Sequence, residues 1–170
     1  YELQRALKRL PGVELSGLVA SAERRTFTYT KPLVHRPGKP PEELNRLDIK
    51  NWTPTPPAIR EQLVKHMATL AARTDGLILM DQVDVAETGV VTPELLGEVA
   101  RSLQAHGSWL VLGDSRRGLS GWPPISFKMN AAELKAMSGV ETSSVESCLR
   151  AVELVATRNG RPAFVTMAEK

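Results

Sequence analysis

"GLILMDQVDVAETGVVTPELLGEVARSLQAHGSWLVLGD", residues 76–114, decides the fold. It holds an apolar run at 76–80, a segment of helical periodicity at 93–105 and a second apolar run at 109–114. Apolar runs separated by an amphipathic helix are typical of parallel strands joined by a crossover helix. The stretch therefore predicts a β-α-β unit of an α/β protein.

The same alternation continues downstream. Strands are expected at 126–129, followed by a short helix, and at 163–167, with a helix over 145–158 between them. Ser143 and Glu146 have the spacing of a capping box at the start of the helix at 145–158. The pattern predicts a mostly parallel sheet flanked by helices.

Ligands of open α/β sheets bind at the carboxyl ends of the strands. In this chain those positions are held by Asp81, Asp114, Asn130 and Thr166. They are the first candidates for a functional site.

A different pattern precedes the α/β unit. Residues 26–34 and 44–49 alternate and are rich in β-branched and aromatic residues, and they flank a Pro/Gly-rich loop, which predicts a β hairpin over 26–49. From Ala58 the period is helical, so an α/β core is expected over 58–170. With 170 residues and 42% hydrophobic content, residues 1–170 are expected to belong to one domain.

Composition excludes several classes of function. The 22 basic and 19 acidic residues are interspersed, which argues against a nucleic-acid partner. The single Cys148 cannot form an internal disulfide, and the three histidines lack zinc-ligand spacing, so a reducing cytoplasmic setting is expected. The apolar runs are far shorter than a membrane span, so no membrane partner is expected.

"GDSRRG", residues 113–118, raises the alternative of a serine hydrolase with Ser115 as nucleophile. Arg117 occupies the last position of what would be a Gly-x-Ser-x-Gly elbow, and all histidines precede Ser115, so the pattern of that class is not met. No Gly-x-Gly-x-x-Gly and no Walker A motif occurs either. A bound phosphate would need another cradle, such as a helix N-terminus.

Each remaining candidate has a structural and a functional interpretation. Asp81 is either a ligand contact or a strand-end cap, with the cap favoured, and Asp114 caps or braces its loop. Arg116 and Arg117 either meet an anion or are solvated. Asn130 and Glu133, in "KMNAAELKAMSG", have the spacing of a capping box but could also hold phosphate and a hydrated magnesium ion.

Taken together, the order of parts resembles the PfkB family of ribokinase-like carbohydrate kinases. The resemblance rests on a strand ending in Asp81, a loop into "VVTPELL", a strand ending in "GDSR", and a strand followed by Asn-x-x-Glu and a helix closed by glycine. "TFTYTKPLV" and "LNRLDI" are similar to the Thr-rich and Arg-x-Asp strands of the branch that contains heptose-phosphate kinases. "AFVTMAEK" is similar to the strand that begins the family's nucleotide site.

The resemblance implies a three-layer sandwich and transfer of the ATP γ-phosphoryl group to a hydroxyl of a sugar or sugar phosphate. Glu133 would orient Mg²⁺ through its waters, Asn130 would lie by the nucleotide phosphates, and Thr166 would lie near the nucleotide. Asp114 and Arg116 would lie close to the same cleft. Family members often dimerise through strands that project from the sheet as a lid, and the hairpin at 26–49 could be such an element, or its edges could be covered within one chain.

The chain also departs from the family pattern. The Gly-x-Gly-Asp segment with the catalytic aspartate would follow Lys170, and the glycine-rich sugar-binding part would precede Tyr1, so residues 1–170 are expected to be an internal fragment that is inactive alone. Ala168 replaces a glycine of the nucleotide strand, and "DQVDVAETG" replaces "DYGKG". The alternative is a degenerate PfkB-like domain that binds a ligand or serves in assembly without catalysis.

Overall fold

The computed structural model describes residues 2–167, so Ala168 lies outside the described residues. Its centre is a parallel four-stranded sheet in the order β5-β6-β7-β8. The strands are β5 (Gly76–Asp81), β6 (Leu110–Ser115), β7 (Ser126–Asn130) and β8 (Ala163–Thr166). Sequential parallel strands confirm the predicted α/β class.

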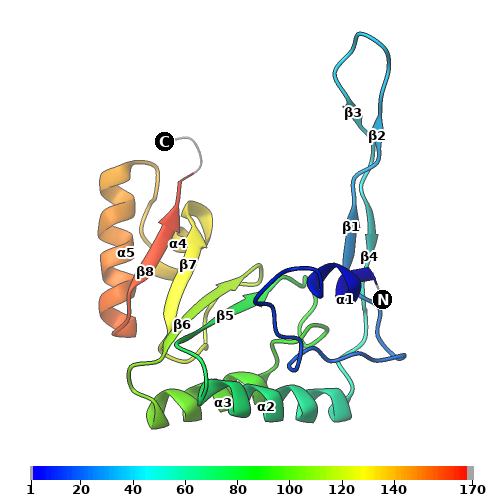
Figure 1. The fold of residues 1–170 in the computed structure, drawn as a ribbon. Helices are drawn as coiled ribbons and strands as arrows, with labels where there is room; N and C mark the ends of the chain where they lie inside the picture. The colour runs from blue at the N-terminus through cyan, green and yellow to red at the C-terminus, as the bar shows by residue number, and fades with distance from the viewer. Residues whose placement is uncertain (1, 168–170) are drawn as a thin grey trace.

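Four helices accompany the sheet: α2 (Pro57–Ala71), α3 (Pro93–Ala105), α4 (Ala131–Ser138) and α5 (Val145–Asn159). The helices α2 and α3 run side by side next to β5 and β6, whereas α4 and α5 accompany β7 and β8 (Figure 1). No helix among residues 2–167 is long and apolar enough to cross a membrane.

One face of the sheet carries the core. Val111, Phe127 and Met129 lie on this face, and they are buried together with Val99 of α3 and Leu134 of α4. In register across the parallel strands, Leu77 pairs with Val111 and Phe127 with Ala163, so these side chains share the covered face. The described helices and the sheet thus form two layers, and a third layer stays a prediction.

The opposite face of the sheet is not covered by any helix among the described residues. Its side chains include Ile78, Met80, Leu110 and Phe164, which are 54–68% exposed. Parallel sheets are ordinarily covered on both faces. This open face is therefore an apolar surface of the described part.

The predicted hairpin is present but is divided into two ribbons. β1 (Thr28–Thr30) pairs with β4 (Leu47–Ile49), and β2 (Leu33–Val34) pairs with β3 (Glu42–Glu43), all antiparallel. The hairpin projects as an arm away from the sheet, whereas α1 (Glu2–Leu7) lies near its base (Figure 1). The predicted second strand at 44–49 was too long, because pairing resumes only at Leu47 and the loop itself supplies β3.

The helix ends mostly follow their sequence signals. The Thr92 side chain accepts a hydrogen bond from the Leu95 N–H, as expected for an N-cap. The predicted Ser143–Glu146 capping box is wrong by one residue, because Ser144 is the N-cap and Ser147 completes the box. The Glu146 N–H and the Ser144 side chain hydrogen-bond to the Glu146 carboxylate and lower its pKa, so Glu146 stabilises the first turn instead.

Candidate functional site

The start of α4 is the best-formed element at the carboxyl edge of the sheet. The Glu133 N–H donates to Asn130 Oδ1 at 2.9 Å, and the Asn130 N–H donates to Glu133 Oε2 at 2.7 Å, which confirms the capping box. The cap holds both side chains in fixed positions where β7 becomes α4. Gly139, with φ 73°, ends the helix in the left-handed conformation that glycine adopts readily.

Thr166 lies beside this cap. It is the register partner of Asn130 across β7 and β8, and its hydroxyl donates to the Met129 carbonyl at 3.4 Å. Two of the predicted nucleotide residues are therefore neighbours on adjacent strands. The structure brings these two residues together, and their role at a nucleotide stays a prediction.

The residues at this edge suit a metal ion that keeps most of its water ligands better than an ion that is bound by protein ligands alone. Among residues 2–167, no group of three or more His, Cys, Asp or Glu side chains could enclose a metal. Glu133 Oε2 accepts the hydrogen bond of the cap, and Oε1 accepts none from the side chains and backbone of residues 2–167. Mg²⁺ usually keeps several waters and takes one or two carboxylates, so one carboxylate oxygen at this position is a suitable donor.

Asp114 lies on the open face of the sheet and pairs with a residue that the sequence analysis did not single out. Lys128 of β7 approaches Asp114 Oδ2 with its Nζ at 3.1 Å, and both side chains are partly buried. The signal was a lysine inside the apolar strand "SFKM", where a charge needs a partner. Asp114 therefore braces β6 against β7.

Asp81 forms a buried link between the loops that follow β5 and β6. Its Oδ2 accepts hydrogen bonds from Ser115 Oγ at 3.1 Å and from Arg117 Nη2 at 3.0 Å. The Arg116 N–H donates to the Asp81 carbonyl at 3.0 Å. This confirms the structural interpretation of Asp81. Its Oδ1 is also buried and has no hydrogen-bond partner among the described residues.

Ser115 is not placed for nucleophilic attack. Its side chain is buried, and its hydroxyl donates to Asp81 instead of to a histidine. A serine nucleophile needs an adjacent base and access to the substrate. The geometry agrees with the rejection of the hydrolase.

Arg116 lies on the β5 side, at the base of the hairpin. Its Nε donates to Gln82 Oε1 at 3.2 Å, its Nη1 is 3.8 Å from Asp84 Oδ1, and its guanidinium lies 5.3 Å from the centroid of the Tyr29 ring. Lys50, just after β4, pairs with the same Asp84. In the part of the chain that the structure describes, Arg116 forms no hydrogen bond or ion pair with the α4 cap, so Arg116 and the cap residues lie in two separate groups.

The charges at the hairpin base shift one another's pKa values. The hydrogen bond from Lys50 holds the pKa of Asp84 below its ordinary value, and the same contact raises the pKa of Lys50. The hydrogen bond from Arg46 lowers the pKa of Asp48 in the same way. Each carboxylate is therefore held in its charged form.

Sequence reasoning missed this cluster, although a signal was present. Arg46, Asp48 and Lys50 alternate through β4 and the residues on either side of it, which puts them on one face, and Asp48 is the register partner of Tyr29. The alternation was used only to predict a strand. The pairing with Asp84 depends on how the hairpin meets the β5 loop, which no local pattern contains.

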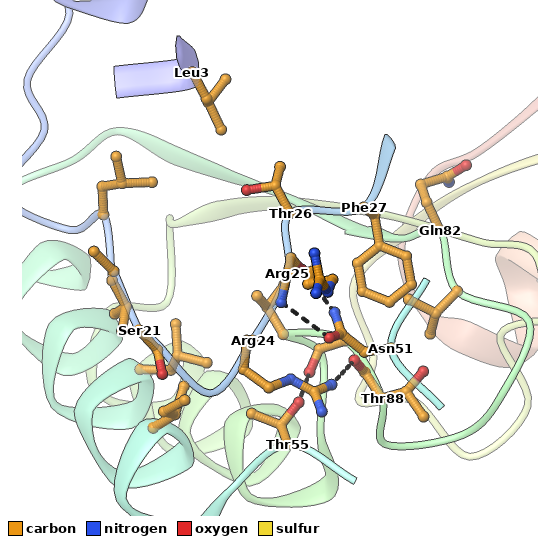
Figure 2. A pocket seen from close by; sticks show the side chains of 18 of the residues that line it. Leu3, Ser21, Arg24, Arg25, Thr26, Phe27, Asn51, Thr55, Gln82 and Thr88 are labelled. Atoms are coloured by element: carbon orange, nitrogen blue, oxygen red, sulfur yellow. Dashed lines mark hydrogen bonds between the residues drawn. The ribbon is translucent and has the colours of Figure 1, made fainter. Parts of the chain in front are cut away.

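A cavity of about 520 Å³ lies beside the hairpin base, at the carboxyl end of β5. Figure 2 shows Arg24, Arg25, Asn51, Thr55 and Thr88 around it. Arg24 donates to the Thr53 and Thr88 carbonyls, and Asn51 exchanges hydrogen bonds with the backbone of Arg25. Neither arginine forms a recorded ion pair within residues 2–167, and the lining includes Asp81.

Comparison with curated proteins shows a similarity along nearly the whole chain. The chain is similar to HldE. "Bifunctional protein HldE" of Gluconobacter oxydans (strain 621H) is 23% identical over 168 residues, which is 98% of this chain and 33% of HldE. The chain therefore spans about a third of the length of HldE. No family model matches the chain.

Proposed function

We propose that these residues form part of an ATP-dependent kinase that transfers the γ-phosphoryl group of ATP to a hydroxyl of a sugar or sugar phosphate. Three findings support the proposal: the similarity to HldE along nearly the whole chain, the parallel α/β sheet, and the cap of α4 at its carboxyl edge. The observation that carries it is the Asn130–Glu133 cap opposite Thr166, because it sets a carboxylate and a helix N-terminus where phosphates and a metal would meet.

Each residue has a role in this proposal. Phosphoryl transfer depends mainly on positioning and on neutralisation of charge. The α4 N-terminus and Asn130 lie by the nucleotide phosphates, Thr166 lies near the nucleotide, and Glu133 orients hydrated Mg²⁺. Asp114 and Arg116 flank the same edge, with Arg116 supplying positive charge.

The acceptor is proposed to enter the cavity beside the hairpin base. Asp81 Oδ1 is buried, so the side chains that this cavity offers to an acceptor include Arg24, Arg25 and Asn51. Arg24 and Arg25 supply positive charge in the same lining. The two arginines support an acceptor that carries a phosphate group, and its identity is left to experiment.

The test is magnesium-dependent ATP binding and turnover by the intact protein that contains these residues. Glu133→Gln preserves the capping geometry, because glutamine also suits a capping box, but removes the charge that attracts Mg²⁺. We expect MgATP turnover with a panel of sugars and sugar phosphates to fall at least about tenfold. Glu146→Gln, in the first turn of α5, is the matched control and should leave turnover unchanged.

Two other outcomes would change the assignment. An active wild type that is unaffected by Glu133→Gln would remove the metal role of Glu133. An intact protein that binds MgATP but transfers no phosphoryl group to any sugar would support the non-catalytic ligand-binding domain instead.

A further inference from the structure

A second cavity of about 520 Å³ is bounded by α3, by the β5–α3 loop and by the β6–β7 loop. The β5–α3 loop also lines the cavity beside the hairpin base, but the two cavities share no lining residue. The volume lies in the range of small-molecule sites. The proposed kinase chemistry uses none of the residues of this second cavity, so a ligand here would be additional to ATP and the acceptor.

The aromatic part of the lining is the Trp122 ring of the β6–β7 loop. Its position depends on Gly113 of β6. A Cβ atom at Gly113 would lie 2.8 Å from Ile125 Cδ1 and 3.0 Å from Trp122 Cζ3, so the ring packs against the strand where a side chain is missing. Because the ring is held by this packing before a ligand arrives, little ordering cost is left for binding.

Gly97 leaves room on the α3 side of the cavity. A glycine inside a helix destabilises the helix relative to alanine. Apart from the backbone of α3, a Cβ atom at Gly97 would meet only Arg101 Nη1 within 4 Å, at 3.9 Å. Packing within the described residues therefore does not require glycine here, and the missing side chain deepens the cavity instead.

The wall at Glu87 is also preformed. Glu87 has φ 61°, in the left-handed region that residues other than glycine seldom adopt. The Thr55 N–H donates to the Glu87 carbonyl at 2.8 Å, and the Glu87 carboxylate lies 3.0 Å from Arg60 Nη1. Such a conformation persists where the surrounding contacts fix it.

The charges of the lining are already paired. Arg117 Nη2 lies 3.0 Å from Asp81 Oδ2, and the carboxylate of Glu87 is paired with Arg60. Within residues 2–167, Nε and Nη1 of Arg117 donate to no acceptor. The cavity thus offers hydrogen-bond donors beside an apolar surface, while a charged ligand would lose hydration without gaining a free counter-charge.

We propose that this cavity binds a small neutral ligand with a planar aromatic body and a carbonyl or carboxamide group. The aromatic body lies between Trp122 and Gly97, and Arg117 donates to the carbonyl oxygen through Nε or Nη1 while Nη2 stays on Asp81. A guanidinium has enough N–H donors for both contacts. This inference is independent of the proposed kinase function.

The first experiment compares three probes that share one ring system and differ in charge: naphthamide, naphthoate and naphthylmethylammonium. NMR titration of the intact protein that contains these residues measures their affinities. We expect naphthamide to bind at least about tenfold more tightly than either charged probe, because only the charged probes lose ionic hydration. Absence of naphthamide binding overturns the site, and tighter binding of a charged probe overturns the assigned ligand class.

The second experiment fills the cavity without weakening the helix. Gly97→Leu should reduce naphthamide affinity at least about tenfold and should keep or raise the unfolding temperature, since leucine is the better helix former. Gly107→Leu is the matched control, because Gly107 lines neither cavity and a Cβ atom there meets nothing within 4 Å. Wild-type affinity in Gly97→Leu contradicts the proposal.

The third experiment tests the polar contact. Arg117→Lys keeps a positive charge beside Asp81 but removes the donors at Nε and Nη1, so naphthamide should bind about two- to tenfold more weakly. Unchanged affinity overturns the role of Arg117. Glu133→Gln should bind naphthamide like the wild type, because the α4 cap lies outside this cavity, so the kinase proposal and this site can fail independently.

Discussion

Asn130 and Glu133 cap one another: each backbone N–H is satisfied by the other residue's side chain, at 2.7 and 2.9 Å. The pair therefore stabilises the start of α4 whether or not a ligand is bound. It follows that stability and ligand binding at this edge can be altered separately by the choice of substitution.

Asn130→Ala should lower the free energy of unfolding by about 1 kcal/mol, because the Glu133 N–H loses its acceptor. Asn130→Asp should retain most of the stability, since aspartate is an equally good N-cap. Urea denaturation followed by circular dichroism measures both. Equal stability of the alanine variant and the wild type would show that the cap contributes nothing.

Leu134→Ala should cost about 2–5 kcal/mol, because Leu134 is fully buried in the core beneath the sheet and its loss leaves a cavity. Leu110→Ala is the matched control on the open face, where the side chain is 61% exposed, and should change stability by less than about 0.5 kcal/mol. Thermal and urea unfolding of the two variants compare the two faces directly. Similar losses would mean that both faces are covered.

Arg117→Met should destabilise the chain by about 1–3 kcal/mol, because it leaves the buried Asp81 carboxylate with Ser115 as its remaining side-chain partner. The double variant Asp81→Asn with Arg117→Met should recover part of the loss, since the unpaired charge is gone. Arg36→Met removes an exposed pair with Glu42 and should cost about 0–1 kcal/mol. A double-mutant cycle at neutral pH measures the coupling.

Acid should release the hairpin arm. The folded-state pKa of Asp84 lies below the ordinary 3.8, so the stabilisation that Asp84 provides is complete above that value and is lost as pH falls through the lower, folded value. Arg46, Lys50 and Arg116 face this carboxylate, and Asp48, lowered likewise, titrates in the same range.

Hairpin amide chemical shifts followed by NMR should therefore stay constant through neutral pH and change only below about 3.8. Because Lys50 has a raised pKa, its charge is retained until pH exceeds the ordinary 10.5. Asp84→Asn should reduce the acid step at Tyr29 and Lys50, and the part that remains should be removed by Asp48→Asn, because Asp48 also pairs with Lys50. A transition near neutral pH would point to a different group.

The α/β core could be predicted closely because its signals are local. The helix at 93–105 was predicted with its observed bounds, since Thr92 and Pro93 mark its start and apolar periodicity marks its length. The cap at Asn130 follows from a three-residue spacing. The capping box of α5 was predicted one residue too early because Ser143 and Ser144 are equally suitable N-cap residues. The packing of α5 decides which of the two serines begins the helix.

The rest of the candidate site depends on tertiary register, which spacing does not contain. Lys128 meets Asp114 because β6 and β7 are aligned with Gly113 opposite Phe127. Arg116 meets Tyr29 because the arm folds back toward the β5 loop, although 87 positions separate the two residues in sequence. Their grouping becomes visible only in three dimensions.

The bare face of the sheet gives salts two opposing effects on this molecule. Sulfate is excluded from protein surfaces and promotes burial of apolar groups, so it should drive molecules that consist of these residues to associate through Ile78, Leu110 and Phe164. The same ions screen the pairs at Asp84 and loosen the arm. Sulfate therefore favours association through the open face while it weakens the attachment of the arm, and chloride at the same ionic strength should give the weakening with less association.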